Sequence, residues 1–228
     1  MSHIEMIASF ALFVGFLLFG LYFFNPLNNQ RLFDSTLYYA TKAIDDNITT
    51  HSISYGIALS PSVNAPAVVV PLSRGDVGGY GVYVEDSLGN RVPSAQIAQG
   101  VAFDRTDYFF QIRFGDFPYH GDPPQNPLLL TFGNDYTISA SEELDLIDET
   151  RARQLAEAYR SDYDSLKTRF NIPRRVDFAF MIKLSDADQI NATREIPADV
   201  ESFAQTKRVR LTKEDGSTSF ADMTVVVW

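Results

Sequence analysis

Few residues of this chain have the types and spacing that catalysis or metal binding requires. The three histidines, His3, His51 and His120, lie in three separate regions and share no ligand spacing. The glycine-rich run at residues 75–81 leads into an expected strand rather than a helix, and it lacks the spacing of a phosphate-binding loop. These residues therefore predict neither a zinc site nor a nucleotide site.

Two groups of carboxylates have a structural explanation beside a chemical one. The acids at residues 142–149 could form a catalytic pair, but the first turns of a helix favour acidic residues without any catalytic role. Asp186, Asp188 and Asn191 could offer oxygen ligands to Ca²⁺, but the glycine and final glutamate of an EF-hand loop are absent. We therefore expect an acidic helix start, a surface loop, no cofactor, and a protein that is not an enzyme.

Charge and cysteine content exclude further classes of function. The formal net charge of the 228-residue chain is −10, whereas phosphate binding needs a basic surface, so nucleic acid is not an expected partner. The chain has no cysteine, which excludes disulfides, thiolate metal sites and thiol catalysis.

One apolar segment dominates the amino-terminal region. Residues 6–24 carry no charge, and a single acid, Glu5, precedes them. At about 1.5 Å per helical residue, this run approaches the ~30 Å thickness of a hydrocarbon core. It is longer than the apolar part of a secretory signal, and no cleavage pattern follows it. We therefore expect a retained membrane or filament-core helix. Glu5 would either lie hydrated at an interface or neutralise a positive group in an assembly.

The same helix is expected to continue in a second, amphipathic half. Aromatic residues recur every three or four positions and predict one stripe, and they are Phe10, Phe13, Phe16, Phe19 and Phe23. Gly15 and Gly20 lie among them and would let packed helices approach closely. Pro26 should kink the helix, and an apolar period with a polar opposite face then continues to residue 45.

Beyond residue 45 the pattern is mostly that of strands. Alternating or β-branched runs, separated by turn signals, predict strands at residues 53–59, 68–70, 79–85, 101–114, 128–138, 176–184, 206–212 and 220–228. Asp215-Gly216 predicts a hairpin between the last two strands, with the terminal Trp228 in the core. One helix should interrupt the series, with Ser139 as N-cap, Glu142 completing a capping box, and an end before Pro173.

These elements predict an α+β fold with two parts. Residues 1–45 would form a long N-terminal apolar helix with a kink near Pro26. Residues 46–228 would form a β-rich, sandwich-like globular head with one inserted helix, long enough to fold alone. Two sequons, at Asn47 and Asn191, fit N-glycosylation acceptors on an exported protein, although such triplets also arise by chance.

The first residues carry a resemblance to a known family. Ser2-His3-Ile4-Glu5-Met6, followed by the apolar run and Pro26, resembles the mature start of type IV pilins and their archaeal pilin-like relatives. The resemblance covers about residues 1–45. It implies that a basic leader is removed and that Met1 is the mature first residue. It also implies that Glu5 meets the amino terminus of a neighbouring subunit and that the apolar helices bundle into the filament core. The amphipathic half of the helix would pack against a β-rich head.

The sequence therefore favours a structural subunit of an extracellular type IV pilus-like filament. The chain would form a helical homo-oligomer through its N-terminal helix, reside in the cytoplasmic membrane before assembly, and end on the cell surface in an adhesive appendage. Glu5, Phe10, Phe13, Phe16, Phe19 and Pro26 are the expected assembly residues. The alternative is a solitary single-pass, membrane-anchored ectodomain that acts as a binding module. An anchored enzyme is a third class, for which no residues stand out.

Overall fold

The computed structural model describes residues 3–23, 26–72, 81–116, 121–185 and 187–228. Within two helices, the side chains at residues 4–5, 21–23 and 26–32 are outside this description. The described helices are α1 (His3–Phe23), α2 (Pro26–Ile48), α3 (Glu149–Ser161) and α4 (Tyr163–Arg169). The described strands are β1 (Thr49–Leu59), β2 (Ala67–Val70), β3 (Gly81–Asp86), β4 (Arg91–Val92), β5 (Ser94–Ile97), β6 (Gly100–Asp104), β7 (Phe109–Gly115), β8 (Leu128–Leu129), β9 (Tyr136–Asp148), β10 (Phe178–Lys183), β11 (Gln189–Ala192), β12 (Phe203–Thr212) and β13 (Thr218–Val227).

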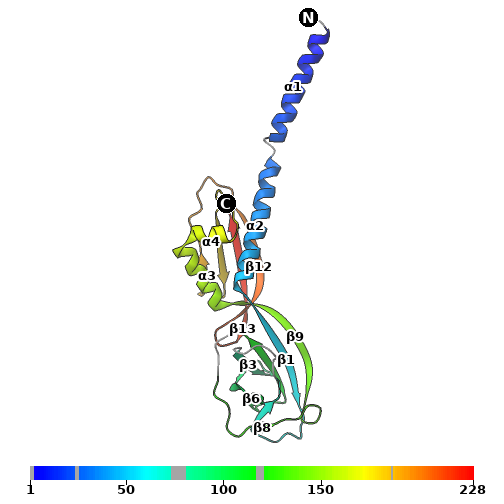
Figure 1. Ribbon diagram of the computed structural model, residues 1–228, viewed down its shortest axis with the longest axis vertical. Coiled ribbons are helices and arrows are strands. Elements are labelled where there is room, and N and C mark those ends of the chain that lie inside the picture. Colours follow the sequence, from blue (N-terminus) through cyan, green and yellow to red (C-terminus); the bar gives the residue numbers. More distant parts are fainter. Residues whose placement is uncertain (1–2, 24–25, 73–80, 117–120, 186) are drawn as a thin grey trace.

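A curled nine-stranded sheet dominates the described part of the chain, in the order β11-β10-β13-β12-β9-β1-β7-β3-β4. A four-stranded sheet, β5-β6-β2-β8, packs beside one half of it. In Figure 1, α1 projects from the top of the molecule, α2 continues downward beside one group of strands, and a second group of strands lies below. We call the group of β10–β13 with α2, α3 and α4 the upper lobe. The group of β1, β3, β4, β7 and β9 with the four-stranded sheet is the lower lobe.

Each lobe has its own apolar core. In the upper lobe, Ile44 of α2, Tyr159 of α3 and Phe180 of β10 belong to one cluster of buried side chains. In the lower lobe, Phe103 and Phe114 belong to a second cluster between the two sheets. The head is therefore two packed units that share one sheet.

The lobes are joined at a narrow region of the large sheet. β9 pairs with β12 in parallel through only two residue pairs, Leu211↔Ile147 and Thr212↔Asp148. The β12–β13 hairpin then reaches the lower lobe, where the Gly216 carbonyl accepts a hydrogen bond from Arg113 Nη1 at 3.1 Å. Gly216 has φ +82°, a conformation that glycine adopts without strain, so this turn depends on the Asp-Gly sequence.

Several elements expected from the sequence are confirmed. β12 and β13 form the predicted hairpin, paired from Phe203↔Val227 to Thr212↔Thr218, and Trp228 is buried. Strands are present in every other region expected to hold one, although their bounds differ. The helix predicted between Ser139 and Pro173 ends in α4 at Arg169, before Pro173 as expected.

The predicted fold class is wrong. The single long N-terminal helix is two helices, because Pro26 begins α2; proline suits a first helical position, where its missing N–H costs nothing. The head holds two inserted helices instead of one, and the curled sheet replaces the expected sandwich. Among the side chains described on α1, the continuous stretch is residues 6–20, and no described helix is long and apolar enough to cross a membrane.

The predicted helix start at Ser139 is also wrong. Ser139 and Glu142 lie within β9, which pairs with β1 from Thr49↔Ile147 to Leu59↔Tyr136. The long β1 strand offers a partner edge that local capping patterns do not reveal, so tertiary pairing prevails over helix propensity. The true N-cap of α3 is Asp148, whose carboxylate accepts a hydrogen bond from Arg151 N at 2.8 Å. Asp162 ends α3 and caps α4, which explains the second helix.

Candidate assembly interface

The described surface of α1 is apolar and exposed. Its large apolar side chains are exposed by fractions from 47% at Leu17 to 77% at Leu12. The exposed set is Met6, Ile7, Phe10, Leu12, Phe13, Phe16, Leu17, Leu18 and Phe19. Figure 1 shows α1 extended beyond the head, so the globular part of the same chain does not cover this surface.

The expected aromatic stripe is a spiral on this helix. Three residues turn an α-helix about 60° short of a full revolution, so successive phenylalanines shift round its surface. Phe10, Phe13, Phe16 and Phe19 thus form a ridge over half of the circumference, whereas Ala8, Ala11 and Gly15 share the remaining side. A Cβ added at Gly15 would meet no atom within 4 Å, so packing within the chain does not require glycine there.

Two predicted assembly residues lie partly outside the description. The backbone of Glu5 belongs to α1 and that of Pro26 opens α2, but the side chains of both are outside the described set. Met1 is outside the described residues altogether.

The acids considered for paired catalysis lie on both sides of the junction between β9 and α3. Glu142, Glu143 and Asp145 are exposed on the strand, and Asp148 and Glu149 flank the helix start. Asp145 Oδ1 lies 2.5 Å from His51 Nδ1, with side-chain exposures of 71% and 80%. The pair borders a groove of about 590 Å³ that Asp45, Lys207 and Arg210 also line. Both side chains are mostly exposed to solvent, where such a contact contributes little to stability.

The loop considered for Ca²⁺ carries an ion pair instead. Asp188 Oδ1 accepts a hydrogen bond from Arg153 Nη2 at 3.3 Å, and Asn191 lies in β11. Asp186 is outside the described residues, and no group of metal-ligating side chains is found among those described. His120 and most of the glycine-rich run are also outside the description, whereas Gly81 begins β3.

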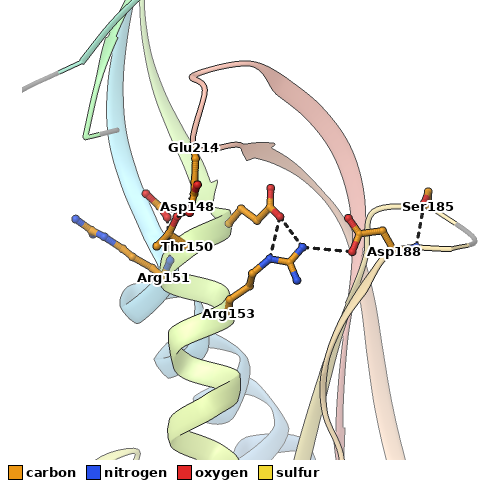
Figure 2. A network of polar contacts seen from close by, with 8 residues as sticks. Asp148, Thr150, Arg151, Arg153, Ser185, Asp188 and Glu214 are labelled. Carbon is orange, nitrogen blue, oxygen red and sulfur yellow. Dashed lines mark hydrogen bonds and ion pairs between the residues drawn. The ribbon is translucent and has the colours of Figure 1, made fainter. Parts of the chain in front are cut away.

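A polar network ties α3 to both lobes. Figure 2 shows Arg153 pointing from α3 across to Asp188, while Thr150 and Glu214 lie close together at the helix start. Arg153 also donates to Glu149 Oε1 at 2.6 and 2.9 Å, and Thr150 Oγ1 donates to Glu214 at 3.3 Å. Arg151 pairs with Asp116 from the lower lobe. This network fixes the helix start and is structural in character.

Two buried cationic residues, Arg113 and Lys167, were not predicted to have carboxylate partners. Arg113 is buried beside Glu85, 3.6 Å away, and burial lowers the pKa of its guanidinium. Lys167 donates to Asp177 at 2.8 Å, as does Tyr163 at 2.9 Å. Burial acts to raise the pKa of Asp177, but these hydrogen bonds outweigh it and lower that pKa overall. The sequence signal for the first of these groups is a charged residue, Arg113, within the largely apolar run of β7.

The sequon residues lie in regular elements. Asn47 is exposed near the end of α2, where its side-chain amide donates to the Ala43 carbonyl at 2.7 Å. Asn191 is half-buried in β11, and its backbone carbonyl accepts a hydrogen bond from Arg160 at 2.6 Å. Glycosylation of either residue remains a prediction.

Comparisons of the chain with protein-family models, with curated proteins and with solved structures find no match.

Proposed function

We propose that the chain is a structural subunit of an extracellular, type IV pilus-like filament that assembles through α1. The observation that carries this proposal is the exposed apolar surface of α1, from Met6 to Phe19. Soluble monomers rarely expose a contiguous apolar surface larger than a few hundred Å², and larger ones usually mark an interaction site. The same helix in other copies of the chain has an equally apolar surface, which can pack against this one and bury it.

The shape of α1 supports packing against its own copies. The phenylalanine ridge of one helix can lie along the face of another that carries Ala8, Ala11 and Gly15, since small residues allow backbones to approach closely. Burying each phenylalanine away from water stabilises the assembly by roughly 1.5–3 kcal/mol. Because the ridge and the small face differ, the contact is heterologous, so it can repeat from copy to copy along a filament.

The family resemblance supplies the remaining parts of the proposal. Glu5 would pair with the amino terminus of a neighbouring copy, and the heads would face outward on the cell surface. Asn47 and Asn191 would be candidate sugar attachment points on such heads. Each of these parts rests on the sequence resemblance or on the sequons.

Substitution of the ridge tests the proposal. Replacing Phe10, Phe13 and Phe16 by serine should abolish filaments in purified samples viewed by electron microscopy, because the apolar contact is lost. The matched control replaces Tyr38 and Tyr39 by serine, since these are similarly exposed aromatic residues on α2, 61% and 62% exposed.

The control separates a specific interface from general loss of apolar surface. We expect the Tyr38→Ser, Tyr39→Ser variant to form filaments with wild-type yield. Equal filament yields from wild type and the triple Phe variant would overturn assembly through α1. Circular dichroism of both variants should show an unchanged head.

A further inference from the structure

The long strands β9 and β12 pair over a short region only, and beyond it each strand has an edge without a partner strand in the part of the chain that the structure describes. β9 and β12 share only the pairs at Leu211↔Ile147 and Thr212↔Asp148. On the side away from β1, residues 137–146 of β9 have no strand partner among the described residues. On the side away from β13, the same holds for residues 203–210 of β12. Figure 1 shows β9 along the outer side of the lower lobe.

The edge of β9 is acidic, and two of its three acids have no ion-pair partner among the described residues. Glu142 and Glu143 are exposed, and neither forms an ion pair with a described residue. Asp145 adds a third acid, already paired with His51. Open strand edges attract other strands, and charged residues are a common means of discouraging unwanted pairing.

The edge of β12 is basic, although the whole chain is acidic. Arg208 and Arg210 are exposed and lie against the Phe220 ring, 5.0 and 5.7 Å from its centre. Neither forms an ion pair with a described carboxylate, even though Asp222 is the cross-strand neighbour of Arg208. α2 packs on the opposite face of this strand, where Phe33 stacks on Phe203 at 5.0 Å. The arginine face therefore stays open.

The geometry points to a second interface, between the globular heads, in which the β9 edge of one copy pairs with the β12 edge of the next copy. Strand addition satisfies the backbone groups of both edges, and the acidic and basic side chains select the partner. Pairing of two β9 edges would set Glu142 and Glu143 against their own copies, and pairing of two β12 edges would oppose arginines, which is unfavourable.

This interface joins two different surfaces, so it can repeat from copy to copy and produce a chain of heads. It concerns head residues alone and does not depend on α1. It deepens the proposed filament by adding a contact between heads, and it stands or falls by its own test.

The absence of cysteine in the chain permits a direct test by cross-linking. One full-length copy carries Ser141→Cys on β9, and another of different tag size carries Gln205→Cys on β12; both residues are exposed. A short bismaleimide should join the mixed copies chiefly as the heterodimer. A copy with Glu157→Cys on α3 replaces the β9 variant as the control and should cross-link poorly. Predominant homodimers, or heterodimer yields equal to the control, would overturn the inference.

Charge exchange tests the recognition itself. Glu142→Arg with Glu143→Arg on the β9 copy should reduce heterodimer yield about fivefold. Adding Arg208→Glu and Arg210→Glu to the other copy should restore it. Glu157→Arg and Arg175→Glu, exposed charges elsewhere, should change nothing. Failure of the exchanged pair to restore the yield would overturn charge selection. Heads that cross-link without forming filaments would support this interface and overturn assembly through α1. Filaments whose heads cross-link no better than the control would support assembly through α1 and overturn this interface.

Discussion

Asp148 is the residue at which the sheet becomes helix. It is the last residue of β9, pairs with Thr212 of the other lobe, and caps α3 through the Arg151 amide. Burial raises the pKa of its carboxyl, and the hydrogen bond from Arg151 opposes that rise only in part. The Asp148 side chain therefore has two opposing effects on stability: its charge is buried, and its oxygen caps the N-terminus of α3.

Substitutions at Asp148 should separate these two roles. Asp148→Ala removes the cap and should lower the free energy of unfolding by about 0.5–2 kcal/mol. Asp148→Asn keeps a capping oxygen without the charge, so its stability at neutral pH should equal or exceed that of the wild type. Urea titrations of the three proteins measure the differences.

The pH dependence at Asp148 follows from the raised pKa. Between the ordinary and the raised value, the folded protein binds the proton more tightly than the unfolded chain does. Ionisation of Asp148 therefore lowers stability as pH rises through the raised pKa. Asp148→Asn should remove this decline, and an Asn variant as unstable as the Ala variant would contradict the account.

Elements with local signals were predictable, and elements with distant partners were not. The β12–β13 hairpin carries its own Asp-Gly turn, so the sequence was sufficient. β9 begins with a capping-box pattern, and only the long β1 strand, far away in the chain, turns it into a strand. The open edge around Glu142 depends on that pairing, so it could not be anticipated either.

The element α2 belongs to the core of the upper lobe. Ala40, Ile44 and Ile48 are fully buried against α3 and the sheet. A head that begins at residue 46, after the predicted boundary, would lack Ala40 and Ile44. We therefore expect the head to need the C-terminal part of the helix that the sequence predicts over residues 1–45.

Two shortened chains test this role of α2. Residues 33–228 retain Phe33 on Phe203 and should unfold cooperatively. Residues 46–228 lack Ile44 and should be less stable by at least about 2–5 kcal/mol, the usual cost of deleting a large buried aliphatic side chain. Denaturant titration compares them, and equal stabilities would show that α2 is dispensable.

The whole molecule places an apolar helix at one end and a two-lobed head at the other (Figure 1). The head is held together by its own cores, by the β12–β13 turn at Arg113 and by the network around α3. The sequence predicted one sandwich-like head. It did not anticipate two lobes, because their division depends on strand pairing across the whole chain.

Electron microscopy of the full chain, transferred from detergent to buffer, is the most direct test of the central claim. We expect filaments of uniform width from the full chain and dispersed single heads from residues 33–228, because the exposed surface of α1 is the proposed assembly contact. A full chain that stays dispersed under these conditions, or filaments formed equally well by residues 33–228, would contradict it.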